Sequence, residues 1–266
     1  MTRLRSPPPP EPLRAHRALA ADVAGAEPLP EAGCADCAAC AAGALSIYAP
    51  TLAHAPEKLR VLRQRKRRFG PHQVIARHSD PADFVYTLET GWAYRVVQFP
   101  DGRRQILSFL LPGDTIAAEA ICAADYSAPY TVRALTHATA CGFRPHQLRE
   151  LVFACETQRD HFTRYLLEQR AYAERRITDF GRRRALGSLA HLLVELFTAL
   201  RARGLAQDNA ADFPPRQEDL ADALGLTTAH VNRTLLTLRR RGLVSIQNGK
   251  LRVHDLAGLR KTAVDN

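Results

Sequence analysis

Residues 215–254 constrain the fold more strongly than any other stretch of the sequence. Residues 217–224 have the spacing of a short amphipathic helix, and Gly225-Leu226 supplies a tight turn after it. Thr227 is expected to cap a second helix over residues 228 to about 240, because its hydroxyl can accept a hydrogen bond from an unpaired first-turn amide. The apolar stripe of that helix consists of Val231, Leu235 and Leu238. The pattern therefore predicts two helices packed across a glycine turn.

The other face of the second predicted helix is polar and basic. Two alternating runs, 243–247 and 250–254, then flank Asn248-Gly249, a strong signal for a β-hairpin. This order of elements is typical of a winged helix-turn-helix whose second helix enters the DNA major groove, and the alternative is an ordinary helical hairpin. The side chains predicted to contact DNA are Gln217, Thr228, His230, Asn232 and Arg233. Those predicted to meet backbone phosphate or solvent are Arg239, Arg240 and Arg241.

The net charge of +10 over 266 residues favours a polyanionic partner. We find no run of about 18 apolar residues, so no membrane-spanning segment is expected. Residues 1–17 contain arginines and four successive prolines but no apolar core segment, which does not fit a secretory signal. A cytoplasmic location is therefore expected. The sequence also has no glycine-rich phosphate loop, no nucleophile elbow and no histidine pair at metal spacing, so we do not expect an enzyme.

The organisation of the chain follows from composition and periodicity. Residues 1–45 are rich in Pro and Ala, carry clustered cysteines and are predicted to form a disordered tail. Residues 46–157 alternate short apolar runs with Gly, Pro and Asp turns at intervals of about 8 to 12 residues, which is typical of an all-β sandwich or barrel. The predicted strands cover residues 84–88, 93–97, 105–110, 131–135 and 139–143.

A long helix is predicted next, over residues 158–182. Its apolar residues fall on spacings of three and four, and a stripe sustained for about six turns between two domains favours a dimer seam. The alternative is packing of this helix on its own β-domain. The predicted seam residues are Phe162, Leu166, Ala173, Ile177 and Phe180. The remaining 183–266 form the predicted DNA-binding domain, with a helix over 184–203 as its floor and a polar loop over 204–215.

Four motifs resemble the bacterial Crp–Fnr family of transcription regulators. They are Pro112-Gly113-Asp114, Val132-Arg133-Ala134, the run 219–227 and Val231-Asn232-Arg233. The resemblance covers about residues 45 to 260. It implies an α+β fold with an N-terminal β-roll (a jelly-roll of the cyclic-nucleotide-binding kind), a long dimerisation helix and a C-terminal winged helix-turn-helix. It also implies a homodimer that reads a palindromic operator in double-stranded DNA and acts with RNA polymerase.

The resemblance bears on individual residues. Arg233 matches the recognition-helix arginine of the family, and arginine paired with guanine is the commonest specific contact. Ala229 stands where many members have glutamate, so the half-site is expected to differ from the usual one. The family's β-roll can bind a cyclic nucleotide through a Gly-Glu turn and an Arg-Ser pair. Here the segment expected to supply the pair reads Ala128-Pro129, and because an unpaired buried phosphate is costly, cyclic nucleotide binding is not expected.

The cysteines resemble those of the Fnr branch, in which N-terminal cysteines and one distant β-roll cysteine hold an oxygen-labile [4Fe-4S] cluster. The corresponding ligands here are Cys34, Cys37, Cys40 and Cys141. Thiolates suit iron–sulfur iron, and four cysteines are the usual set. Tyr48 stands where the family's third N-terminal cysteine usually falls, so structural zinc and a metal-free tail stay open. Cys122 and Cys155 lie among apolar neighbours and are expected to be buried, with Cys122 as a substitute ligand.

These observations favour a homodimeric, oxygen- or redox-responsive transcription factor. The first alternative keeps the transcription factor without a cluster, under control by abundance, thiol oxidation or an unknown ligand. An enzyme, or a store of iron or zinc, would belong to other classes. Neither accounts for the predicted winged helix.

Overall fold

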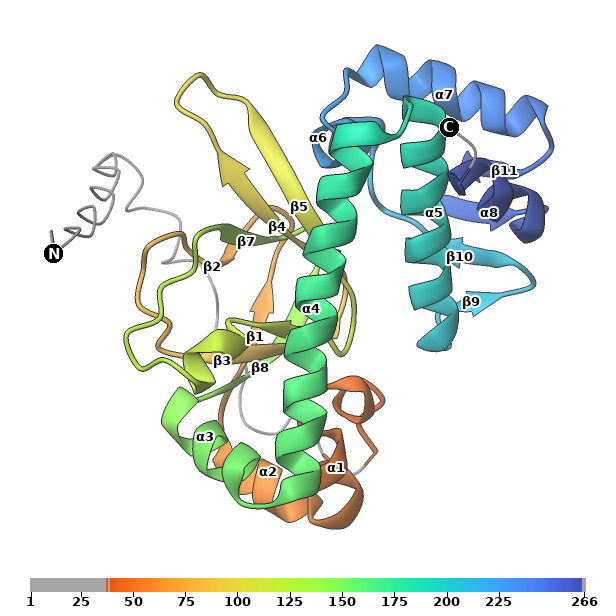
Figure 1. The fold of residues 1–266 in the computed structure, drawn as a ribbon. Coiled ribbons are helices and arrows are strands. Elements are labelled where there is room, and N and C mark those ends of the chain that lie inside the picture. The colour runs from red at the N-terminus through yellow and green to blue at the C-terminus, as the bar shows by residue number, and fades with distance from the viewer. Residues whose placement is uncertain (1–36, 38, 265–266) are drawn as a thin grey trace, which may run out of the picture.

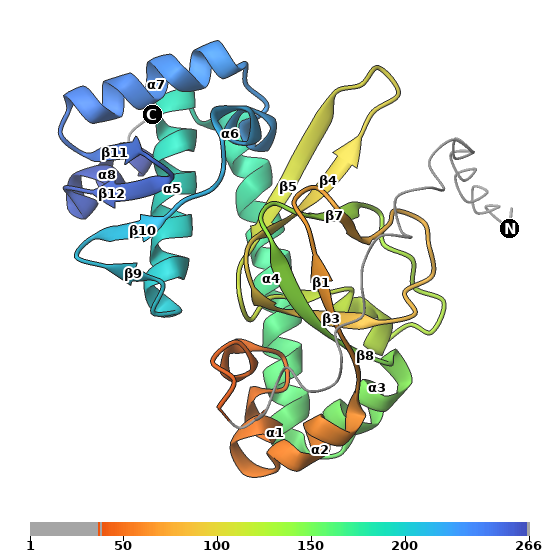
Figure 2. The same ribbon diagram turned by 180° about the vertical axis from the view of Figure 1, so that it is seen from behind.

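A computed structural model of the protein describes residue 37 and residues 39–264, and it confirms the predicted α+β fold. A β-roll is followed by a long helix, α4 (Glu156–Arg182), and then by a winged helix-turn-helix. In both Figure 1 and Figure 2, α4 runs along one side of the β-roll, and the C-terminal domain lies near the end of this helix. The helix therefore connects the two domains and contacts both.

The β-roll consists of two antiparallel sheets in the orders β1-β8-β3-β6 and β2-β7-β4-β5. The strands are β1 (Arg63–Phe69), β2 (Val74–Ala76), β3 (Val85–Thr90), β4 (Ala93–Gln98), β5 (Arg104–Leu110), β6 (Thr115–Ile116), β7 (Thr131–Ala134) and β8 (Ala138–Phe143). Their inward side chains form a core that includes the fully buried Leu88, Ile116 and Val132. The strands predicted from the alternation of apolar runs and turns are thus confirmed.

Strand β1 was not predicted, because six of its seven residues are basic or amide side chains. It lies at an edge of its sheet and pairs with β8. Lys66 forms an ion pair with Glu89 at 2.7 Å, and the guanidinium of Arg65 lies 3.4 Å from the ring centre of Phe84. These contacts within the domain explain how a strongly charged segment is accommodated in a sheet.

The described end of the predicted tail is ordered. Most of the tail, residues 1–36 and 38, lies outside the described residues, but residues 39–45 form turns and a short 3₁₀ helix, η2 (Gly43–Leu45). This segment packs on the β-roll at Gly113, whose φ is +98° and where an added Cβ would lie 2.7 Å from the Cβ of Leu45. Only glycine fits this position. The ordered unit therefore begins before residue 46, because the end of the tail has apolar surface to bury.

Short helices that the sequence analysis did not predict complete the N-terminal domain. They are α1 (Ala49–His54), α2 (Pro56–Leu62), η3 (Ala118–Ile121) and α3 (Pro145–Phe153). Together with the start of α4 they bury a core that contains Ile47, Leu59 and Phe143.

The C-terminal domain is built on α5 (Ala185–Ala202), as predicted. By length and composition alone α5 could cross a membrane, but Leu189, Leu193 and Phe197 are fully buried in the domain core. Around α5 lie α6 (Gln217–Leu224), α7 (Thr228–Arg240), β11 (Val244–Gln247), β12 (Lys250–Val253) and α8 (Leu256–Val264).

The prediction of a polar loop over residues 204–215 was wrong. This segment contains β9 (Ala206–Gln207) and β10 (Ala210–Asp212), and β10 pairs with β12 to extend the wing sheet. Asp208 and Asn209 form the turn with φ values of +47° and +59°. Asp and Asn tolerate such values, which suit a two-residue hairpin. The strands are short and alanine-rich, so they lack the β-branched pattern that marks a strand in a sequence.

Candidate nucleic-acid interface and cysteine site

The two helices of the motif meet across the glycine turn as predicted. Gly225 ends α6 with a φ of +65°, and the backbone amide of Leu226 donates to the carbonyl of Ala221. The hydroxyl of Thr227 accepts a hydrogen bond from the amide of His230 at 3.2 Å, so this residue caps α7. The helix covers residues Thr228–Arg240 and buries Val231, Thr234 and Leu238 against the core.

The outward face of α7 carries the predicted DNA contacts. Thr228, Asn232 and Arg233 are exposed, and His230 is half-buried. Arg233 and His230 line a shallow hollow beside the α4–α5 junction. Asn232 lines a second groove, between α7 and β11, together with Gln217 at the start of α6. The predicted residues thus lie on the solvent side of one two-helix unit, with Asn232 and His230 toward opposite edges of α7.

The wing follows directly after α7. Strands β11 and β12 pair in an antiparallel hairpin. Asn248 and Gly249 connect them with φ values of +51° and +69°, as a type I′ turn requires. The predicted hairpin is therefore confirmed, and its second strand presents the exposed Lys250 and Arg252.

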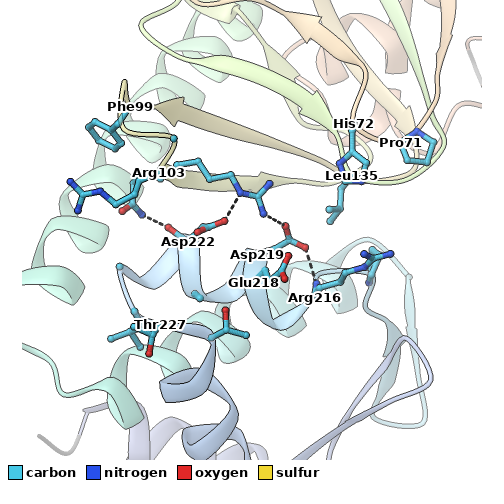
Figure 3. A pocket seen from close by; sticks show the side chains of 18 of the residues that line it. Pro71, His72, Phe99, Arg103, Leu135, Arg216, Glu218, Asp219, Asp222 and Thr227 are labelled. Carbon is cyan, nitrogen blue, oxygen red and sulfur yellow. Dashed lines mark hydrogen bonds and ion pairs between the residues drawn. The ribbon is translucent and has the colours of Figure 1, made fainter.

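The C-terminal domain docks on the β4–β5 hairpin through α6 (Figure 3). The guanidinium of Arg104 forms ion pairs with Asp219, at 3.0 Å, and with Asp222. Burial raises the pKa of Asp222, and the positive charge of Arg104 opposes this shift. Asp219 also accepts a hydrogen bond from the amide of Arg216 at 2.9 Å, so this carboxylate caps α6 as well.

Replacing Arg104 by methionine should loosen this docking. The side chain of Asp219 is only 7% exposed and would lose this ion-pair partner, at a cost of roughly 1 kcal/mol. Hydrogen exchange in the α6 peptide should accelerate by about fivefold. Arg103→Met is the matched control, since Arg103 is 82% exposed and pairs with Asp101 instead. Equal exchange in the two variants would show that Arg104 does not hold the domains together.

The predicted seam residues on α4 separate into two groups. Phe162 is 2% exposed and packs in the core of its own β-roll domain, and Leu166 packs partly against the same core. Ala173, Ile177 and Phe180 are exposed, Ile177 at 70%. Phe162 is therefore unavailable to a partner, because the first turns of α4 bind the β-roll. Gln158 contributes to this attachment by donating to the carbonyl of Ile47 at 2.6 Å.

Three of the four predicted metal ligands lie within the described residues. Cys141 is buried on β8, and Cys37 and Cys40 are half-buried in the segment that packs below it. Tyr48 lies between them. Burial raises the pKa of its phenol, and Cys141 and Cys40 lie close enough to raise this pKa further. Cys34 lies outside the described residues, and within these residues no three His, Cys, Asp or Glu side chains form a metal-binding group.

The other two cysteines differ from their prediction. Cys122 and Cys155 are exposed rather than buried, because they lie at the ends of η3 and α4. Burial of its sulfur still raises the pKa of Cys122, an effect that Arg149 opposes. A raised pKa disfavours the thiolate that a metal needs.

Polar side chains of the β-roll bond to one another and to α4. The guanidinium of Arg95 donates to Gln169 of α4, at 3.0 Å, and to the carbonyl of Thr115. The hydroxyl of Tyr165 donates to the same carbonyl at 3.2 Å. Ala128, at the expected place of the phosphate-binding arginine, is buried and apolar. The Arg-Ser pair that the resemblance requires for a cyclic phosphate is thus absent from this segment.

Two family models match the chain: a cyclic nucleotide-binding domain over residues 66–155 and a Crp-like helix-turn-helix domain over residues 187–262. The transcriptional activatory protein AadR of Rhodopseudomonas palustris is 31% identical over 200 residues, which cover 71% of this chain and 77% of AadR. An anaerobic regulatory protein of Haemophilus influenzae is 26% identical over 243 residues, covering 89% and 93%. The structure of FixK2 from Bradyrhizobium japonicum superposes with a TM-score of 0.67 at 23% identity, covering 76% and 98%.

A β-roll, a connecting helix and an exposed, capped recognition helix define a DNA-binding transcription regulator. With these relatives, the chain belongs to the Crp/Fnr family of regulators. This family consists of transcription regulators and not of enzymes. The predicted family and fold are confirmed.

Proposed function

We propose that the protein is a cytoplasmic, homodimeric regulator that reads a palindromic operator and responds to oxygen through a [4Fe-4S] cluster. The observation that carries the DNA-binding part is the outward face of α7, where Arg233 and Asn232 stand exposed on a capped helix. Regulators of this kind act with RNA polymerase, which we propose as the protein partner. Specific binding of a palindromic duplex by the purified chain is the test of this part.

The exposed stripe of α4 supports the dimer. We define it as Ala173, Ile177 and Phe180, and the half-buried Leu166 lies at its N-terminal end. Large apolar side chains at this exposure are uncommon on a helix that is otherwise charged, and their spacing suits a second copy of the same helix. A two-fold axis parallel to α4 would relate the two recognition helices of a dimer. Such a pair suits an operator whose half-sites are about one DNA turn apart. In this proposal residues 158–182 form the dimerisation helix, between a sensor domain and a DNA-binding domain that begins at 183.

The cysteines support the sensor. Their thiols are the donors that iron–sulfur iron prefers, and Cys40 and Cys141 flank the same buried phenol. In the proposal Cys34, Cys37, Cys40 and Cys141 hold the cluster, whose loss in oxygen supplies the signal. The sulfur of Cys37 accepts a hydrogen bond from the guanidinium of Arg63 at 4.0 Å. Because the described cysteines do not form a closed ligand group, binding requires the turn at residues 37–40 to rearrange.

A contiguous set of contacts would carry this rearrangement toward the DNA-binding domain. Leu45, five residues after Cys40, packs on Gly113. The adjacent Asp114 forms an ion pair with Arg203 at 2.6 Å, and Arg203 also donates to the carbonyl of Pro112 at 2.9 Å. Arg203 directly follows α5, the floor of the winged helix. A change at the cysteine segment would therefore displace a turn that contacts both domains.

Anaerobically purified protein should be brown and contain about four irons per chain, because four thiolates ligate one cluster. Cys141→Ser should lose most of this iron, because a serine hydroxyl does not replace a thiolate ligand. Cys155→Ser is the matched control and should retain the iron, since Cys155 is exposed at the start of α4. If an anaerobic preparation of the unaltered chain is colourless and iron-free, the cluster is excluded. The DNA-binding part of the proposal is not affected by that result.

One observation favours the cluster-free alternative. Tyr48 is buried in the core of the N-terminal domain, near Cys40 and Cys141, and stands where the family's third N-terminal cysteine usually falls. Control would then come from protein abundance, thiol oxidation or a different ligand. DNA affinity that is indifferent to air and to Cys34→Ser would support this alternative.

A further inference from the structure

Leu236 occupies an unusual place on the recognition helix. Successive residues of an α-helix are about 100° apart, so the buried Val231, Thr234 and Leu238 place Leu236 on the opposite, outward side. It lies one turn beyond Asn232 and three residues beyond Arg233. Its side chain is 42% exposed. A large apolar group therefore stands among the polar and basic side chains that face solvent on α7.

Local packing accounts for only part of this position. Leu236 lines the groove between α7 and β11, together with Leu235 and Ile246. The inner wall of this groove belongs to the domain core, and Leu235 already packs against that core. The exposed part of Leu236 points away from it, on the face that DNA would approach. Single exposed leucines are common on protein surfaces, so its placement beside the predicted base contacts is the informative observation.

The major groove of DNA presents one apolar group at the base edges, the C5-methyl group of thymine. Leu236 lies about 4.5 Å along the helix axis from Arg233, and adjacent base pairs are about 3.4 Å apart. It would thus reach a base pair one or two steps from the guanine that Arg233 reads. We propose that Leu236 is a specificity-determining residue that contacts a thymine methyl group in each half-site. This inference rests on the proposed DNA-binding function.

The test begins with an operator selected by the full-length chain from randomised duplexes. Thymines in this operator are then replaced one at a time, in both half-sites, by deoxyuridine, which removes only the methyl group. At one thymine position the affinity of the unaltered protein should fall by about fourfold per half-site, the effect of losing one buried methyl group. For Leu236→Ala the same replacement should have no effect, because the contacting side chain is already missing.

Leu205→Ala is the matched control, because Leu205 has a similar exposure, 43%, and lies just after α5. This variant should respond to deoxyuridine as the unaltered protein does. Three outcomes overturn the inference. The selected operator could lack a thymine at that distance from the guanine, or deoxyuridine could change the affinity equally at every thymine position. Finally, the replacement could lower the affinity of Leu236→Ala as much as that of the unaltered protein. Failure to select any sequence would instead contradict the proposed DNA-binding function, so the two failures are distinguishable.

Discussion

Ile177→Asp should convert the protein to a monomer and lower its affinity for a palindromic operator by at least about 100-fold. Ile177 is 70% exposed in the exposed stripe of α4, so the substitution leaves the fold of the single chain intact. At a two-fold seam the variant would bring two carboxylates together in an apolar contact, which is strongly unfavourable. Loss of the second half-site contact removes the gain from bivalent binding, typically 10²–10⁴-fold. Sedimentation of the free protein and titration of a labelled duplex measure the two effects.

Arg164→Gln provides the control for charge. It also lowers the net charge by one, but Arg164 is exposed on a different side of α4 from Ile177. This variant should remain dimeric with nearly unchanged affinity. If Ile177→Asp stays dimeric, the exposed stripe is not the seam.

Arg233→Ala should weaken binding to the selected operator by roughly 1–3 kcal/mol, which is about 5- to 150-fold, and should relax discrimination at one base pair of each half-site. Arg233 is exposed at the middle of the outward face of α7, and its fork of donors matches the two acceptors of guanine. Affinities for the operator and for its three single-base variants at that position, at one fixed salt concentration, give the measurement.

Arg241→Ala removes the same positive charge at the end of α7 and serves as the control. It should weaken all sequences alike, because phosphate contacts position the protein without reading bases. Uniform weakening by Arg233→Ala as well would assign Arg233 to the phosphate backbone and leave the guanine contact unsupported.

The elements that the sequence predicted best are those whose signals are local. The cap at Thr227, the turn at Gly225 and the hairpin at Asn248-Gly249 each depend on a few adjacent residues, and all three formed as expected. Strand β1 was missed because its basic side chains are accommodated by Glu89 and Phe84, which are distant in sequence. Strand β10 was missed because its pairing with β12 is also nonlocal.

The same distinction explains what could be predicted of the candidate site. The helical spacing identified an apolar stripe on α4, but spacing does not say which part of a stripe meets the chain's own domain. Phe162 is buried there because Ile47 and Phe143 belong to the same core, and this contact depends on the β-roll. Likewise, the cysteine spacing did not reveal that the segment after Cys40 packs on Gly113, because that contact joins residues about 70 positions apart.

The most direct test of the whole account is sedimentation of the full chain with a labelled duplex that carries the selected palindrome, at low and at physiological salt. We predict two protomers on one duplex and clear preference over a scrambled sequence. Affinity should fall steeply as salt rises, by about 10³–10⁵ between 50 and 200 mM if six to ten phosphates are contacted. A chain that remains monomeric and does not distinguish the palindrome from the scrambled duplex at low salt would contradict the account.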